Sequence, residues 1–98
     1  MIIHKAIDGG TMTVAPAGRL DTVTAPELEA VLNEGIAGIN ELIFDLKELE
    51  YISSAGLRVL LSAQKTMDKS GRMVVRNVNE LVMEVFEVTG FSDILTIE

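Results

Sequence analysis

Two adjacent serines, Ser53 and Ser54, are the side chains whose type and position most suggest chemistry in this sequence of 98 residues. They lie in the stretch "LEYISSAGLRVLL" (residues 49–61), directly before a run of leucines typical of a helix. A serine at such a place has two uses. It can start the helix, or it can present its hydroxyl to another molecule.

Both uses are open on these residues alone. Serines before a helix are most often caps, in which the side-chain oxygen accepts a hydrogen bond from a first-turn N–H. If Ser53 is the cap, Ser54 becomes the first helical residue and its hydroxyl is free. A phosphate on Ser54 would then lie near unpaired N–H groups and the positive end of the helix. Gly56, which has no side chain, would let another backbone approach the same turn.

A serine hydrolase is the competing interpretation. Ser54 does not stand in a Gly-x-Ser-x-Gly sequence, and the only histidine, His4, falls in the predicted first strand, so a Ser-His-acid triad is disfavoured. The sequence has no Gly-x-x-x-x-Gly-Lys loop that could cradle phosphates. Three acids could in principle supply a carboxylate pair, although their spacing gives no sign of one: Asp21, Asp45 and Glu50. We therefore expect no enzyme, with a small hydrolase as the least favoured alternative.

Composition argues against several other classes. The net charge of −7 disfavours nucleic acid, which binds basic surfaces, although an acidic surface could be drawn to a basic patch on another protein. One histidine and no cysteine leave an ordinary zinc, copper or iron site without ligands, so we expect no metal and no cofactor. With neither a signal-peptide stretch nor an apolar run of membrane length, we expect a cytoplasmic protein without a membrane role.

Apolar patterns indicate a single domain over residues 1–98. The predicted strands cover residues 2–8, 11–18, 42–46, 72–77 and 94–98. The predicted helices cover residues 24–36, 54–69 and 78–89. This order predicts an α/β fold with a mixed sheet of four to five strands, an N-terminal β-hairpin and helices packed on the sheet. The later strands should be parallel, because helical crossovers connect them.

Two sequence signals predict how the first and third helices begin. Thr24 with Glu27, and Asn77 with Glu80, have the spacing of a capping box, in which each side chain satisfies a backbone N–H of the first turn. We therefore expect Thr24 and Asn77 to be N-caps.

Turns and burial are also readable. Residues 8–10, "DGG", are typical of a hairpin turn, and Gly71 and Gly90 should end the second and third helices. Residues 42–46, "LIFDL", form a nearly continuous apolar run, which predicts a strand covered on both faces.

Two longer stretches carry a family resemblance. "GRLDTVTAPELE" and "LIFDLKELEYISSAGLRVLL" resemble the STAS-domain family of anti-sigma factor antagonists, and the similarity runs over essentially the whole chain. Matching positions include Gly18 and Asp21 before the first helix and Asp45 in the third strand. The resemblance implies the STAS fold.

The resemblance also implies which serine is modified. In such proteins the motif commonly reads Asp-Ser-Ser/Thr-Gly, and its first serine is the phosphoacceptor. That serine is Ser54 in this chain, and the glycine is Gly56. Ala55 stands at the Ser/Thr position, and Ser53 replaces the usual aspartate, which removes a negative charge beside the acceptor.

The implied mechanism is partner switching. The unphosphorylated protein would bind an anti-sigma factor, a histidine-kinase-like ATPase that is also a serine kinase, and so free a sigma factor. Phosphorylation would break that complex, and a serine phosphatase of the PP2C kind would restore it. The alternative is a STAS adaptor subunit of another regulatory or lipid-transport assembly, without serine phosphorylation.

The expected partner-binding surface surrounds the acceptor, and we expect a monomer when the protein is free. This expected surface comprises Asp21, Ser53, Ala55, Gly56 and Arg58. Asp21 could instead bond to nearby backbone N–H groups, and Asp45 could tie together the loops above the sheet. Arg58 falls four residues after Ser54, on the same helix face, where it could contact a phosphate or a partner, or be an ordinary surface arginine.

Overall fold

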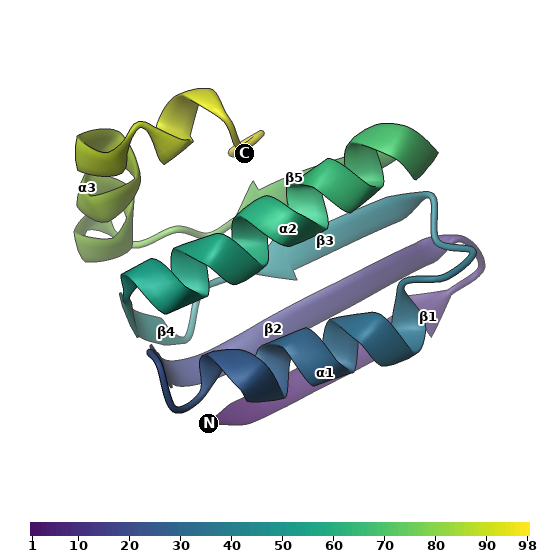
Figure 1. Cartoon of the computed structure of the whole chain (residues 1–98), viewed down its shortest axis with the longest axis horizontal. Coiled ribbons are helices and arrows are strands. Elements are labelled where there is room, and N and C mark those ends of the chain that lie inside the picture. Colours follow the sequence, from purple (N-terminus) through teal and green to yellow (C-terminus); the bar gives the residue numbers. More distant parts are fainter.

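Five strands, three helices and one short 3-10 turn make up the chain, and the computed structural model describes residues 1–98 (Figure 1). The strands are β1 (Ile2–Asp8), β2 (Thr11–Leu20), β3 (Glu41–Asp45), β4 (Leu49–Ile52) and β5 (Arg72–Arg76). The helices are α1 (Ala25–Gly35), α2 (Ser54–Ser70) and α3 (Glu80–Thr89), and the 3-10 turn is η1 (Phe91–Asp93).

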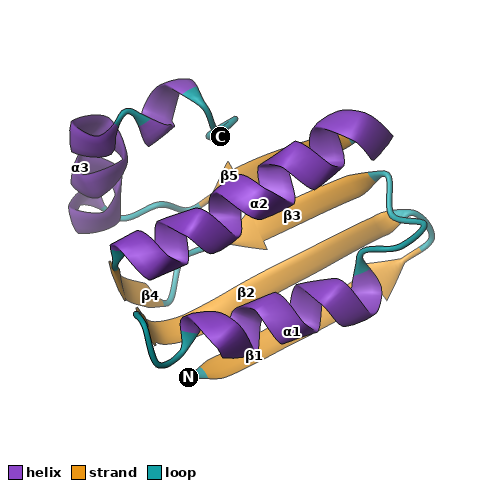
Figure 2. Cartoon of the chain, viewed as in Figure 1, coloured by secondary structure: helices purple, strands orange, loops and turns teal.

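The sheet is mixed, which confirms the α/β prediction. Its order is β1-β2-β3-β5, with β4 also paired to β2. β1 and β2 form an antiparallel hairpin through Gly9 and Gly10, and Gly9 takes the left-handed conformation at φ +61° that such a tight turn requires. The other strand pairs are parallel. Helices α1 and α2 lie across one face of the sheet, and α3 lies beyond its end, next to β4 (Figure 2).

Strand β2 pairs with two different strands along its length. Its residues Thr11–Val14 pair with β3, and its residues Gly18–Leu20 pair with β4. The pairing shifts register between Gly18 and Arg19, where Gly18 has φ +103°. Because of this division β4 lies beside the last residues of β2, so the start of α2 lies at that end of the sheet. The sequence did not reveal β4 as a strand of its own.

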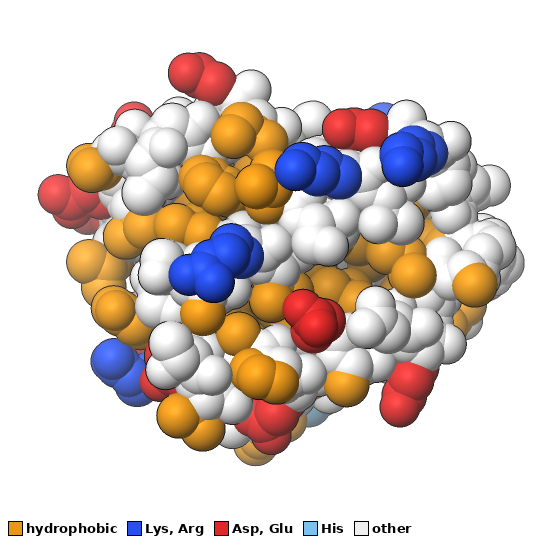
Figure 3. Space-filling model, in the orientation of Figure 1, with side chains coloured by type: hydrophobic (Ala, Val, Ile, Leu, Met, Phe, Trp, Pro, Cys, Tyr) orange, Lys and Arg blue, Asp and Glu red, His pale blue; other side chains and the backbone are white.

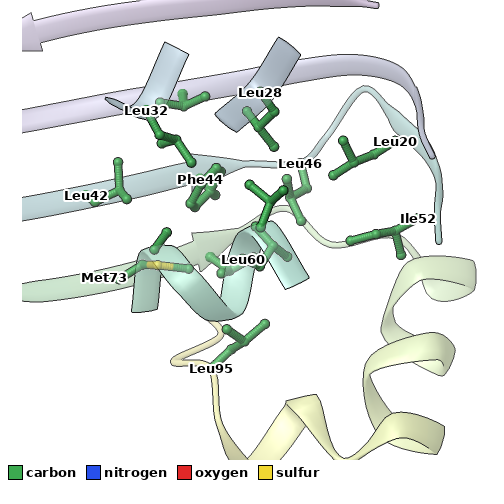
Figure 4. Packing of buried hydrophobic residues seen from close by; sticks show 14 of the residues in the cluster. Leu20, Leu28, Leu32, Leu42, Phe44, Leu46, Ile52, Leu60, Met73 and Leu95 are labelled. Carbon is green, nitrogen blue, oxygen red and sulfur yellow. The ribbon is translucent and has the colours of Figure 1, made fainter. Parts of the chain in front are cut away.

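The core lies between the sheet and the helices and contains 22 buried side chains (Figure 4). Leu28 of α1, Leu60 of α2 and Phe44 of β3 are all 0% exposed. Burying a side chain of this size contributes about 1.5–3 kcal/mol. Residues Leu42, Ile43 and Phe44 are consecutive and buried, and successive side chains of a strand point to opposite faces, which confirms the prediction of a strand covered on both faces.

The predicted cap of the third helix is wrong by two residues. The N-cap is Asn79, whose side-chain oxygen accepts a hydrogen bond from Val82 N at 2.8 Å and whose amide donates to Leu49 O at 2.7 Å. Asn77 instead has φ +57° and donates to Asp45 Oδ1 at 3.0 Å. Contacts with β3 and β4 therefore decide which asparagine caps the helix.

The C-terminal residues form less of a strand than their alternation suggests. Val75 and Ile97 make a single parallel bridge, with Val75 N donating to Thr96 O at 2.9 Å and Glu98 N donating to Val75 O at 2.9 Å. The tail thus covers the outer edge of β5. None of the helices has the length and apolar character needed to cross a membrane.

Candidate functional site

The loops after β2 and β4 meet at one end of the sheet. Leu20, the last residue of β2, pairs with Ile52, the last residue of β4. The next residue, Ser53, donates its N–H to Leu20 O at 2.9 Å. This hydrogen bond brings the loop of residues 21–24 beside the start of α2. Two segments about 30 positions apart in the sequence therefore form one surface.

Ser53 is the N-cap of α2 by backbone but not by side chain. Its backbone is extended (φ −99°, ψ 177°), and its carbonyl accepts from Leu57 N at 2.9 Å. The side-chain oxygen is buried and has no hydrogen-bond partner. The prediction that this oxygen accepts a first-turn N–H is therefore wrong, because the hydroxyl is enclosed by the structure instead of capping the helix. A buried hydroxyl without a partner is destabilising relative to one that is hydrogen-bonded.

Ser54 begins α2, as the sequence predicts, and its side chain is exposed. Its hydroxyl makes no hydrogen bond within the chain. The first turn of α2 contains no acidic residue. The hydroxyl is therefore accessible to another molecule.

Gly56 is buried on the side of α2 that faces the sheet, whereas Ser54 is exposed to solvent. A Cβ at this position would lie 2.7 Å from Leu20 Cγ and 2.8 Å from Ile52 Cγ1. The close approach that this glycine permits is therefore to the ends of β2 and β4. This corrects the expectation that Gly56 leaves room for a visiting backbone, and it explains how α2 can start so close to the sheet.

Asp21 organises the loop next to the two serines. Its Oδ1 accepts hydrogen bonds from Thr24 N at 3.1 Å and from Val23 N at 3.0 Å. The Thr24 backbone bond, with smaller help from Val23, the Thr24 hydroxyl and Arg19, outweighs the effect of burial and lowers the pKa of Asp21. Asp21 therefore has the structural role that the sequence left open.

Thr24 does not form the predicted capping box. It is the N-cap of α1, but its side chain makes no capping bond. Its hydroxyl donates to Arg19 O at 2.7 Å and accepts from Asp21 N at 2.9 Å. The N–H of Glu27, which a capping threonine hydroxyl would satisfy, donates to the backbone oxygen Thr24 O at 3.0 Å instead, and the threonine side chain is turned back toward β2.

Asp45 ties together the loops at the end of β3. Its Oδ1 accepts from Asn77 Nδ2 at 3.0 Å and from Lys47 N at 3.1 Å. Burial raises the pKa of Asp45, but these hydrogen bonds outweigh it and leave the pKa below its usual value. The structural interpretation of Asp45 is confirmed.

A hollow of about 280 Å³ lies between the N-terminal ends of α1 and α2. Its lining residues are Thr22, Ala25, Pro26, Glu29, Ala55, Arg58 and Val59. Both predicted contact residues border this hollow: Ala55, which is half-buried, and Arg58, which is exposed. On the same side of the molecule, apolar side chains reach the surface in patches between a few charged ones (Figure 3).

The arrangement presents a hydroxyl without the groups that would make it a nucleophile on its own. His4 lies in β1, opposite Ala15, and is not among the residues around Ser54. No three acidic, histidine or cysteine side chains are grouped so that they could hold a metal ion.

Comparison with known proteins decides the family. The sequence model of the STAS domain family matches residues 3–98 of this chain. The chain belongs to the STAS domain family. This STAS domain is 32% identical over 100 residues to the anti-sigma-B factor antagonist of Listeria monocytogenes, covering 96% of this chain and 84% of the relative.

Two solved structures share the fold of this chain. An anti-sigma factor antagonist from Mycobacterium paratuberculosis superposes with a TM-score of 0.88 at 24% identity, over 98% of this chain and 83% of that one. The Bacillus cell fate determinant SpoIIAA in its phosphorylated form superposes with a TM-score of 0.77 at 17% identity, over 99% of this chain and 91% of that one. The family and fold predicted from the sequence are confirmed.

Proposed function

We propose that this STAS domain is an anti-sigma factor antagonist whose partner binding is controlled by phosphorylation of Ser54. The observation that carries the proposal is the contrast between the two serines. Ser54 is exposed and free of hydrogen bonds, whereas the Ser53 oxygen is buried. The similarity to an anti-sigma-B factor antagonist along nearly the whole chain supports the same assignment.

The proposed partner is an anti-sigma factor with the fold of a histidine-kinase-like ATPase that is also a serine kinase. Its docking surface on this chain would comprise the Asp21 loop, the start of α2, and the hollow bordered by Ala55 and Arg58. Binding of the unphosphorylated domain would occupy the anti-sigma factor and free the sigma factor. Ser53 and Gly56 would not contact the partner directly but would fix the position of the first turn of α2 on the sheet.

The proposed switch is a phosphoryl transfer at this surface. The Ser54 oxygen would attack the γ-phosphorus of ATP, the bond to the β-phosphate oxygen would break, and ADP would leave, while a base of the kinase takes the hydroxyl proton. The product carries about −1.5 to −2 charge at neutral pH. Such a charge in a contact surface that also contains the ionised Asp21 favours dissociation. A PP2C-type phosphatase would then restore the hydroxyl by hydrolysis.

Incubation with the cognate kinase and ATP tests this proposal. We expect one phosphate per chain, on Ser54 by mass spectrometry, and loss of kinase binding after labelling. Ser54→Ala should bind and stay unlabelled, and Ser53→Ala, the matched control, should still be labelled. Stable kinase binding without labelling of either serine would contradict the switch and favour a STAS adaptor in another assembly.

A further inference from the structure

Arg58 is the only arginine of the chain without a partner inside it. Arg72 and Arg76 form ion pairs with carboxylates at 3.3 and 2.9 Å, and Arg19 lies over an aromatic ring at 4.1 Å. Arg58 is exposed and lies within 4.0 Å of no carboxylate, although the chain has a net charge of −7. Its guanidinium is therefore available to an anion that the unmodified protein does not supply.

The position of Arg58 relative to Ser54 indicates which anion that is. The two residues are four positions apart on α2, so they are neighbours on one helix face. Side chains on a helix tilt toward its N-terminus, which puts Ser54 within reach of a side chain as long as that of Arg58. We infer that phosphate on Ser54 is held by the Arg58 guanidinium, an inference that rests on the proposed function.

Chemistry supports this pairing over the alternatives nearby. A phosphate offers three acceptor oxygens, and the planar guanidinium can donate to two of them in parallel. The competing anions are Asp21, whose Oδ1 already accepts two backbone N–H bonds, and Glu29, which borders the same hollow as Arg58 without pairing with it. A charge of nearly −2 attracts the guanidinium more strongly than either single carboxylate.

The pairing changes the partner surface in two ways at once. Phosphorylation adds negative charge at Ser54, and it also draws Arg58 away from the hollow between α1 and α2. An acidic group of the partner that meets Arg58 in the unphosphorylated complex loses its cation at the same step. The regulation of this site therefore depends on Arg58 as well as on Ser54.

The test installs phosphoserine at position 54 during translation, so that no kinase is needed. The second pKa of the phosphate is then measured by ³¹P NMR titration in the otherwise unchanged chain, in Arg58→Gln and in Lys65→Gln. Lys65 is an exposed cation of the same helix, eleven residues from Ser54, or about 16 Å along the axis. We expect Arg58→Gln to raise this pKa by about 0.3 unit and Lys65→Gln to leave it unchanged.

Arg58→Lys and added salt provide second measurements. Lysine keeps the charge without the planar donor pair, so it should restore part of the shift. Molar salt should narrow the difference in this pKa between the unchanged chain and Arg58→Gln, because it screens the charge of Arg58. Equal pKa values in Arg58→Gln and Lys65→Gln, both folded by circular dichroism, would overturn the inference. That result would leave the proposed function untouched, because kinase labelling of Ser54 is scored separately with the unmodified protein.

Discussion

Replacing Gly56 by alanine measures how closely the first turn of α2 rests on the sheet. The added Cβ would lie 2.7 Å from Leu20 Cγ and 2.8 Å from Ile52 Cγ1, whereas packed carbon atoms prefer about 3.5–4.0 Å. These neighbours are inner carbons of side chains that are 0% and 3% exposed. Neither side chain can turn away into solvent, so the helix or the strand ends must move.

Two effects of opposite sign set the expected magnitude for Gly56→Ala. Alanine stabilises a helix interior by about 1 kcal/mol relative to glycine. Adding a methyl group to a filled core costs about 1–3 kcal/mol, and contacts this short put the cost in the upper part of that range. We therefore expect a net loss of about 1–2 kcal/mol in the free energy of unfolding. For a domain of this size the melting temperature should fall by about 5–10 °C.

Urea and thermal unfolding followed by circular dichroism measure this loss. Ser62→Ala is the matched control, because Ser62 is exposed on the same helix and its replacement gains helix propensity without meeting the sheet. The control should be unchanged or up to about 0.5 kcal/mol more stable. If Gly56→Ala unfolded at the same urea concentration as Ser62→Ala, the close packing of α2 on Leu20 and Ile52 would be refuted.

Three further substitutions test other parts of this end of the sheet by the same unfolding measurements. Ser53→Ala should leave the free energy of unfolding unchanged or raise it by up to about 1 kcal/mol, because the lost hydroxyl is buried and unpaired. A decrease of about 1 kcal/mol would mean that this hydroxyl caps α2. Asn79→Ala should cost about 1–2 kcal/mol by removing the α3 cap and the bond to Leu49 O, and an unchanged midpoint would contradict that cap. The lowered pKa of Asp21 means that its carboxylate stabilises the fold above about pH 4. This stabilisation is lost as the pH falls through the lowered pKa. Asp21→Asn should therefore make the free energy of unfolding depend less on pH in the acid range. An equal dependence on pH in the two proteins would refute the role given to Asp21.

Long elements with a strong period could be predicted from the sequence, and short ones that depend on tertiary pairing could not. The helix from Ser54 and the buried run at residues 42–46 are confirmed because each contains its own apolar pattern. Strand β4 has only four residues and exists by pairing with the end of β2. The choice of Asn79 over Asn77 as the α3 cap likewise depends on Leu49 and Asp45, which are distant in the sequence.

The candidate site shows the same limit at the level of single side chains. That Ser54 begins a helix with an exposed side chain followed from spacing and capping rules. That the Ser53 oxygen is buried without a partner could not follow, because a serine side chain is oriented by packing that no local pattern encodes. The contact of the Asp21 loop with the start of α2 needs the pairing of Leu20 with Ile52, which joins distant segments.

The rigidity of this junction bears on how a phosphate at Ser54 would act. Ser53 N is bonded to Leu20 O, and Gly56 lies directly against Leu20 and Ile52, so the first turn of α2 is fixed to the sheet on both sides of Ser54. A new charge on Ser54 therefore cannot be accommodated by a shift of the backbone without disturbing buried side chains. The exposed side chains around it are free to respond, and Arg58 is the cation within one turn. This arrangement favours a switch that changes the charge of the docking surface while leaving the fold unchanged.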